Sequence, residues 1–592
     1  MASFVASDVY NSIVSSEIYD IPTSVGTPIP FDEHAVSVNL PLWSDVVGYE
    51  EGKKDIVSAM KLGYPRFKIH QYIEELQAKY IIDYIHTNNE YSNNSNCMIL
   101  PTKATALRLK EYLMESIQPE SNFNIINIIN VVDFYDIHVV YYPSTMQSIA
   151  KSYWQHCGEI ISSRVAYDLL KHLNIPVPYV SPCFNRNISI LSDLYHVSYP
   201  ICTTYASLEI EKIIKSRIGD IINEDATIPG TVTLTLSGMS AIYTALRLAQ
   251  KTQQEFYNLT PSSIDIVVFG FPYLDTLKMM KRKELNKSFC HFFGYGNYDD
   301  LVKLEELLKS RNSVANTSYS KIGAIFTEFP TNPLLKISNL VKLTELAAKY
   351  DVILIVDDTV GNFANVDLLH GDHVCVDILC SSLTKIFSGR GDLLAGSLII
   401  NKKSKYSLKM KNIVSNSLEI PSLYYKDSYA LEYNSRDFVI RSSKINVTTR
   451  KLISYFNENE YIQRVYYPVD CNNNDSSLEL MYSNLLRRSD SNMSKYMVDN
   501  QYQPGYGCLI SILFKDDIDV MKFYDALDVH KGPSLGTNFT LVCPYTLLAH
   551  YTELSWAADY GINEKLIRIS VGLEDIDYLI NKFNKAIESS KQ

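Results

Sequence analysis

Short apolar runs alternate with helical periodicity between residues 231 and 400. Short, mainly apolar runs predict strands buried on both faces, and apolar residues three and four positions apart predict the helices between them. This alternation is typical of a mostly parallel sheet covered by helices on both faces. The predicted strands are Thr231–Leu236, Ile264–Phe269, Gly323–Phe326, Val352–Val356, Ile378–Ser381 and Leu394–Ile400.

The patterns on either side of this region predict two further units. The segment from 97 to 173 indicates an α/β unit, with a helix over Ala104–Ser116, strands within Ile125–Tyr142 and one long helix near Met146–Leu173. We assign no chemistry to this segment. The residues after 507 predict a smaller α+β unit with alternating strands and helices at Cys508–Phe514, Asp517–Leu527, Leu566–Val571 and Glu574–Ile587.

The length of 592 residues predicts several domains. Two polar stretches, Asn88–Asn96 and Cys471–Ser477, are typical of solvated loops. We predict an N-terminal extension over residues 1–200, a central domain over 201–440 and a smaller C-terminal domain over 441–592.

Composition narrows the class of protein. Hydrophobic residues make up 46% and charged residues 20%, which is globular composition, and no apolar run approaches the ~20 residues of a membrane span. The first 20 residues lack the features of a secretory signal, so we expect a cytoplasmic protein, with the nucleus as a second location.

The net charge of −11 and the lack of a long Lys/Arg block argue against nucleic acid as a partner. Ten scattered cysteines without a C-x-x-C pair indicate neither disulfides nor a metal site.

Candidate chemistry lies just after the predicted strands, because parallel sheets bind ligands at the carboxyl ends of their strands. Gly238 separates a strand from a helix, so the free backbone N–H groups at the helix start would suit a phosphate, although any strand–Gly–helix junction looks similar. Asp357 ends a fully apolar strand. It is either a helix cap or ion-pair member, or a carboxylate that keeps a heteroaromatic nitrogen protonated.

Lys385 follows the strand that begins at Ile378. A single lysine is usually solvated, and a single tyrosine such as Tyr273 usually packs in a core. Here, however, a phosphate cradle, a buried Asp and an amine follow neighbouring strands in the order in which a pyridoxal-phosphate site is assembled. The hydroxyls of Ser382 and Thr384 would suit phosphate oxygens, and the aromatic side chain of Tyr273 could stack on a planar ring.

Six motifs together resemble the trans-sulfuration family of pyridoxal-phosphate enzymes, in order, over residues 205–590. They are Ser237-Gly238-Met239, Tyr273-x-x-Thr276, Glu328-x-Pro330-x-Asn332-Pro333-Leu334, Val356-Asp357-Asp358-Thr359, Ser382-x-Thr384-Lys385 and Arg568-Ile-Ser-Val-Gly572. Upstream, a block from Thr27 to Phe67 resembles the N-terminal extension of the fungal cystathionine γ-synthase branch. The resemblance implies a fold-type I transferase with an α/β fold, pyridoxal 5′-phosphate as cofactor, small amino-acid substrates and a homo-oligomer, either a dimer or a tetramer.

The resemblance also implies roles for individual residues. Lys385 would bind the cofactor and move protons, and Tyr273 would stack on the ring and assist proton transfer. The other cofactor contacts would come from Asp357, Gly238, Met239, Ser382 and Thr384, and the substrate contacts from Arg568, Ser534 and Asn332.

The chain departs from the family pattern at two places. Family members reach the neighbouring subunit's phosphate with a Tyr/Arg pair, whereas the corresponding segment Tyr195–Leu208 contains no arginine. The stretch from Asp357 to Lys385 is also slightly longer, so we expect a rebuilt loop at Gly361–His373.

The resemblance implies γ-replacement on an O-acylhomoserine by L-cysteine to give cystathionine, within methionine and cysteine metabolism. A carbon–sulfur lyase or a sulfhydrylase would use the same chemistry with a different pocket. A diverged, non-catalytic homologue with a binding or regulatory role is the alternative from another class, motivated by the missing arginine.

Overall fold

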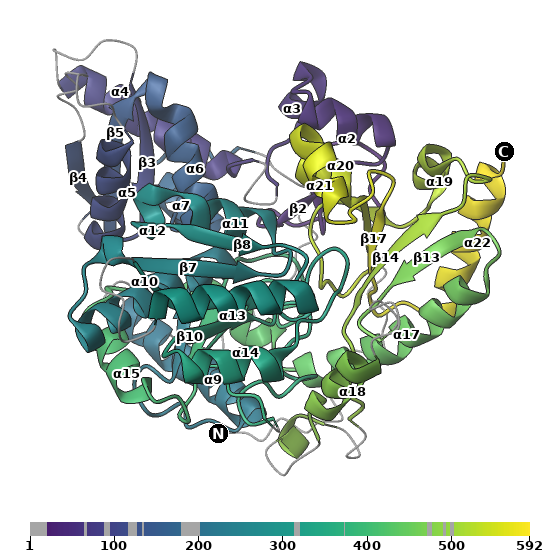
Figure 1. The fold of residues 1–592 in the computed structure, drawn as a ribbon. Coiled ribbons are helices and arrows are strands. Elements are labelled where there is room, and N and C mark those ends of the chain that lie inside the picture. Colours follow the sequence, from purple (N-terminus) through teal and green to yellow (C-terminus); the bar gives the residue numbers. More distant parts are fainter. Residues whose placement is uncertain are drawn as a thin grey trace.

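The computed structural model describes residues 20–63, 68–87, 95–116, 127–132, 135–178, 202–312, 320–371, 373–469, 476–488, 493–497 and 502–592. Most of both predicted polar loops, and residues 195–201 of the segment without arginine, lie outside these ranges. The described residues form three units, each built around its own sheet (Figure 1). Within these ranges, no helix has both the length and the apolarity needed to cross a membrane.

The central unit contains a seven-stranded sheet in the order β6-β12-β11-β10-β9-β7-β8. Strand β12 runs antiparallel to both of its neighbours, and the other pairs are parallel, which confirms the predicted mostly parallel α/β fold. The edge strand β8 was not predicted. The strands are β6 (Val232–Thr235), β7 (Ile264–Phe269), β8 (Cys290–Phe293), β9 (Lys321–Glu328), β10 (Ile353–Asp357), β11 (Ile378–Ser382) and β12 (Gly396–Ile400).

Both faces of this sheet are buried. Along β10, Ile353 and Ile355 point into one core, whereas Leu354 and Val356 point into another. Each such side chain contributes about 1.5–3 kcal/mol by leaving water, which explains the continuous apolar runs in the sequence. The helices of this unit are α9 (Cys202–Ile222), α10 (Gly238–Tyr257), α11 (Leu274–Lys281), α12 (Lys283–Asn286), α13 (Tyr298–Asn312), α14 (Leu340–Lys349), α15 (Ser407–Asn416) and α16 (Tyr425–Asn434).

The C-terminal unit is a five-stranded sheet in the order β13-β14-β17-β16-β15, with helices packed on it (Figure 1). Only β14, β17 and the helices α19 and α22 were predicted. The strands are β13 (Ile462–Tyr466), β14 (Leu509–Phe514), β15 (His530–Lys531), β16 (Leu541–Pro544) and β17 (Ile567–Ser570). The helices are α17 (Phe438–Glu458), α18 (Ser476–Leu485), α19 (Val520–Ala526), α20 (Tyr545–His550), α21 (Leu554–Asp559) and α22 (Ile576–Ser590).

The N-terminal unit has a three-stranded antiparallel sheet in the order β3-β5-β4. The predicted long helix near Met146–Leu173 is wrong, because the chain forms two helices there. Gly158 ends the first with a left-handed backbone (φ 63°), and the Ser162 hydroxyl caps the second by accepting from the Val165 amide. The elements are α4 (Gln71–Thr87), β3 (Ser95–Leu100), α5 (Lys103–Glu115), β4 (Asn127–Val132), β5 (Tyr135–Pro143), α6 (Gln147–Cys157) and α7 (Ser163–His172).

The segment before this unit packs instead on the C-terminal unit (Figure 1). The Tyr524 hydroxyl donates to the Leu40 carbonyl at 2.7 Å, and the Trp43 ring meets the Tyr524 ring edge-on. The N-terminal part of the chain therefore contacts both other units. The elements of this segment are β1 (Pro28–Ile29), β2 (Ser37–Val38), α2 (Trp43–Glu50) and α3 (Lys54–Ala59).

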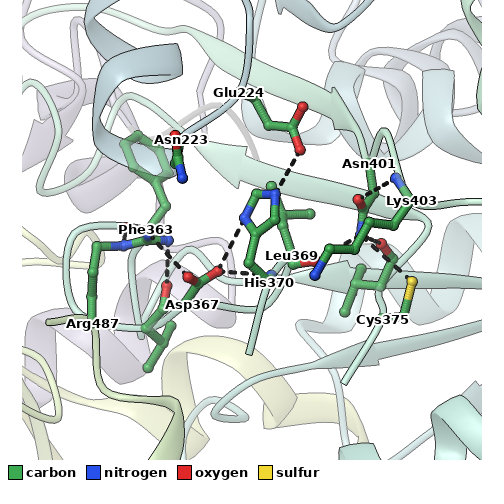
Figure 2. Close-up of polar contacts among 12 residues, drawn as sticks. Asn223, Glu224, Phe363, Asp367, Leu369, His370, Cys375, Asn401, Lys403 and Arg487 are labelled. Carbon is green, nitrogen blue, oxygen red and sulfur yellow. Dashed lines mark hydrogen bonds and ion pairs between the residues drawn. The ribbon is translucent and has the colours of Figure 1, made fainter. Parts of the chain in front are cut away.

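The loop after β10 is held by ion pairs to two other segments (Figure 2). Arg487 donates to the Phe363 carbonyl at 2.9 Å and to the Asp367 carboxylate at 3.3 Å. The ring of His370 lies between Asp367 (3.6 Å) and Glu224 (2.9 Å), which follows α9. This loop contains most of Gly361–His373, and its position is thus set by residues outside it.

We expect His370→Gln to lower the free energy of unfolding by about 1–2 kcal/mol at acidic pH and by less at alkaline pH. Asp367 and then Glu224 raise the pKa of His370 above its usual 6.5. The ion pairs are therefore fully present below pH 6.5 and are lost as the pH rises through the raised value. Thermal unfolding at about pH 5.5 and pH 9 checks this, with His172→Gln on an exposed helix end as the control. An equal effect at both pH values would contradict it.

Candidate active site

One cavity brings the predicted site residues together. It opens at the carboxyl ends of β9, β10 and β11, and residues of all three units line it. Of the ten predicted residues, Lys385, Tyr273, Asp357, Gly238, Met239, Ser382, Thr384, Arg568 and Asn332 line the cavity, and Ser534 lies behind Lys385.

Lys385 lies in the turn after β11 and is buried. Its Nζ donates to the Ser534 hydroxyl at 3.0 Å. Burial, reinforced by the nearby Arg568 guanidinium, holds the pKa of the Lys385 amine well below its usual value. The amine is therefore neutral at a pH where a solvated lysine is charged, which is the form that can attack an aldehyde.

Asp357 ends β10 beside a second buried carboxyl group, Glu328, which is its register partner on β9. Burial and the Asp357 charge hold the pKa of Glu328 well above its usual range. The Thr359 amide (2.9 Å) and hydroxyl (2.6 Å) both donate to one Asp357 oxygen. Burial raises the pKa of Asp357 as well, but the bonds from Thr359 lower it, so Glu328, whose pKa lies well above its usual range, is the neutral member of the pair. A single negative charge at this position fits a protonated ring nitrogen.

The N-terminus of α10 forms a cradle at another side of the cavity. Its first residues, Gly238 and Met239, present backbone amides, and the Ser237 hydroxyl caps the helix by accepting from Ser240. A Cβ at Gly238 would lie 2.7 Å from the Cβ of Ser382, so only glycine permits this approach of helix and strand. Amides, the helix dipole and the Ser382 hydroxyl together suit a phosphate.

Thr384 lies at the edge of this cradle but is engaged elsewhere. Its hydroxyl donates to the Ala395 carbonyl at 3.2 Å and accepts from the Ala395 amide at 3.0 Å. Because a hydroxyl has one proton, Thr384 directs it at Ala395 rather than at the cradle.

Arg568 on β17 supplies a buried cation on the side of the cavity that the C-terminal unit forms. Its guanidinium donates to the carbonyls of Pro533 (2.7 Å) and Ser534 (2.9 Å), and to the Asn332 side chain at 3.3 Å. Among the described residues, no carboxylate lies within ion-pair distance of it. Since an uncompensated buried charge is costly, this site favours an anionic ligand group such as a carboxylate.

Tyr273 precedes α11 and also faces the cavity. Its hydroxyl donates to Asp275 at 2.9 Å, and its amide donates to Glu328. These contacts link the tyrosine to the same carboxyl group that lies beside Asp357.

The residues present fit pyridoxal phosphate. The cradle that a Cβ would fill, the buried neutral amine and the buried carboxylate match its phosphate, aldehyde and ring nitrogen, respectively. Residue-level reasoning from the sequence missed two kinds of lining residue. Glu328 and Thr359 were part of the motifs but received no role, whereas Trp154, Gln155, Gly158 and Ile160 come from a segment to which no chemistry was assigned.

Comparisons with known proteins agree with this site. The family model described as Cys/Met metabolism PLP-dependent enzyme matches residues 230–588, and the model described as fungal trans-sulfuration enzyme, N-terminal domain, matches residues 72–162. The cystathionine γ-synthase of Neurospora crassa is 33% identical over 96% of this chain and 99% of that protein, and that of Saccharomyces cerevisiae is 31% identical over the same shares.

A solved structure of a putative O-acetylhomoserine (thiol)-lyase from Campylobacter jejuni, which contains a pyridoxyl-lysine phosphate, shares the fold. It has a TM-score of 0.50 at 20% identity and covers 64% of this chain and 86% of that one. The fold is therefore fold-type I, as the sequence resemblance predicted. The family model matches more than half of the chain, and the Neurospora crassa relative is 33% identical over nearly its full length. The chain therefore belongs to the Cys/Met metabolism family of pyridoxal-phosphate-dependent enzymes.

Proposed function

We propose that the protein replaces the acyloxy group on Cγ of an O-acylhomoserine with the thiol sulfur of L-cysteine, giving cystathionine and a carboxylic acid. The observation that carries this proposal is the single cavity in which a neutral lysine, a buried carboxylate and a buried arginine meet, the arginine having no carboxylate partner among the described residues. The full-length likeness to the two fungal cystathionine γ-synthases supports the choice of substrates.

The side chains divide the work by position. Arg568 binds the α-carboxylate of the amino acid with the N–H groups that its bonds to neighbouring carbonyls leave available, and Asn332 and Ser534 hold the guanidinium and the lysine in place. Pyridoxal phosphate, when bound, supplies the electron sink that weakens the bonds at the substrate Cα. Lys385 Nζ removes and returns protons at Cα and Cβ, since its depressed pKa lets the amine alternate between neutral and charged forms. Asp357 keeps a negative charge at the ring-nitrogen side of the cavity.

Purified protein supplied with an O-acylated homoserine and L-cysteine tests the proposal. Cystathionine should form, and omission of cysteine should stop its formation. Faster turnover with sulfide than with cysteine would favour a sulfhydrylase, and cleavage of supplied cystathionine without synthesis would favour a carbon–sulfur lyase. A colourless protein that ignores added pyridoxal phosphate would favour the non-catalytic alternative.

Arg568→Lys should raise KM for the homoserine substrate and lower kcat/KM by about 10²-fold, equivalent to about 3 kcal/mol. Lysine keeps the charge but lacks the planar guanidinium, which can donate to the Pro533 and Ser534 carbonyls and to a carboxylate at the same time. Initial-rate kinetics give the measurement, and an unchanged visible spectrum would show that the cofactor is still bound. Unchanged KM would mean that the substrate carboxylate binds elsewhere.

A further inference from the structure

The connection between α6 and α7 forms one wall of the cofactor cavity. Trp154 and Gln155 near the end of α6, and Gly158 and Ile160 after it, line the same cavity as Ser237, Gly238 and Met239. The contact is direct, since the Ser237 hydroxyl is 3.2 Å from the Gly158 carbonyl. This wall belongs to the N-terminal unit, whereas the cradle belongs to the central unit.

Gly158 permits this contact in two ways. Its backbone has a left-handed conformation, and a Cβ there would lie 2.0 Å from Ser237 Oγ and 3.2 Å from Met239 Cβ. Any larger residue would have to displace the start of α10, whose amides form the cradle. The end of α6 therefore packs so closely against the cradle that only glycine fits at position 158.

Buried polar contacts hold the connection in place. Glu159, almost fully buried, accepts two hydrogen bonds from Arg108 of α5 (2.9 and 2.7 Å) and one from the Tyr153 hydroxyl (2.8 Å). On the other side, Arg282 lies 3.1 Å from the ring of His156. A bidentate buried pair of this kind fixes a position strongly, because loss of either partner leaves a buried charge.

The cavity has few positively charged groups that could bind a phosphate, so further donors from this wall would contribute to binding it. Arg568 is the one cation among the described lining residues, because the Lys385 amine is neutral, and both side chains lie against Ser534. The cradle itself contains amides and hydroxyls, which are neutral donors. A phosphate dianion gains from each further donor that faces it, and Gln155 and Trp154 are the side chains of the N-terminal wall that carry N–H groups.

We propose that the α6–α7 connection closes the phosphate end of the cofactor cavity within the same chain, with Gln155 as a donor to the cofactor phosphate and Gly158 as the contact that positions the start of α10. This gives the N-terminal unit a role in retaining the cofactor. The role does not depend on which amino acids the enzyme uses.

Titration of the apoprotein with pyridoxal phosphate, followed by absorbance, tests this without any substrate. Gln155→Ala should weaken pyridoxal-phosphate binding about tenfold, because a hydrogen bond to a charged group is lost. The same variant should bind pyridoxal, which lacks the phosphate, as the wild-type protein does. Ser148→Ala, on the exposed part of the same helix, is the matched control and should bind both as the wild type does.

Gln155→Glu keeps the size of the side chain but places a negative charge at the wall. It should weaken pyridoxal-phosphate binding more than Gln155→Ala does and leave pyridoxal binding unchanged, so it serves as a second variant should the first fail to fold. Gly158→Ala should also weaken pyridoxal phosphate at least about tenfold, because it moves the cradle. Wild-type affinity of both Gln155 variants for pyridoxal phosphate, or an equal loss for pyridoxal, would overturn the proposal.

Discussion

Lys385→Ala is expected to lower kcat by at least about 10²–10⁴-fold and to abolish the visible absorption of the purified protein. The amine is buried, neutral and held by Ser534, and we infer that it both binds the cofactor aldehyde and moves protons on the substrate. Alanine can do neither. Absorbance spectra with and without added pyridoxal phosphate, together with steady-state rates, provide the measurement.

The control for this variant is Lys212→Ala, which removes a lysine side chain that is 69% exposed on α9. It should keep the wild-type spectrum and rate. If Lys385→Ala also kept both, a different lysine would have to bind the cofactor, and the proposed site would be wrong.

Asp357→Asn should reduce kcat by about 10²–10³-fold while leaving the fold intact. The substitution keeps the shape and the hydrogen bonds from Thr359 but removes the charge that keeps a ring nitrogen protonated. The absorption maximum of the bound cofactor should shift as well, because it depends on the protonation of the ring. Rates and spectra of the same preparation would show both effects.

Asp358→Asn offers a matched comparison at the next residue. Asp358 is fully buried, but it is not among the residues that line the cavity. Burial raises its pKa to about 8, so at neutral pH the carboxyl group is largely protonated and the amide replaces a neutral group. We expect kcat to stay within about twofold of the wild type. Equal losses in both variants would mean that the effect is structural and does not arise from the charge of Asp357.

Fully buried strands were predictable because they are almost entirely apolar. The strand Ile264–Phe269 was predicted with its observed bounds, and every residue in it is buried. In contrast, β8 is a four-residue edge strand whose last three residues are partly exposed, so it has no clear apolar run. The reversed direction of β12 also has no sequence signal, because a strand buried on both faces looks the same in either orientation.

Within the site, the residues that follow strands were predictable and those that arrive from elsewhere were not. Asp357 ends β10 and Lys385 follows β11, and the carboxyl ends of these neighbouring parallel strands meet at one edge of the sheet. Gln155 and Gly158 are about 80 residues upstream of the cradle, on a segment that was interpreted as one uninterrupted helix. A glycine such as Gly158 is a typical helix end, but nothing in the sequence indicates that Gly158 contacts Ser237.

The sequence by itself determined the α/β class and the family and predicted the lysine and the carboxylate, because local apolar periods and short motifs are properties of neighbouring residues. Only the tertiary structure decided that Glu328 lies beside Asp357, that Arg568 lies without a carboxylate partner among the described residues, and that the N-terminal unit forms a wall of the cavity. The physical reason is that burial, pKa values and cavity walls depend on which distant segments meet, and distance along the chain does not encode that.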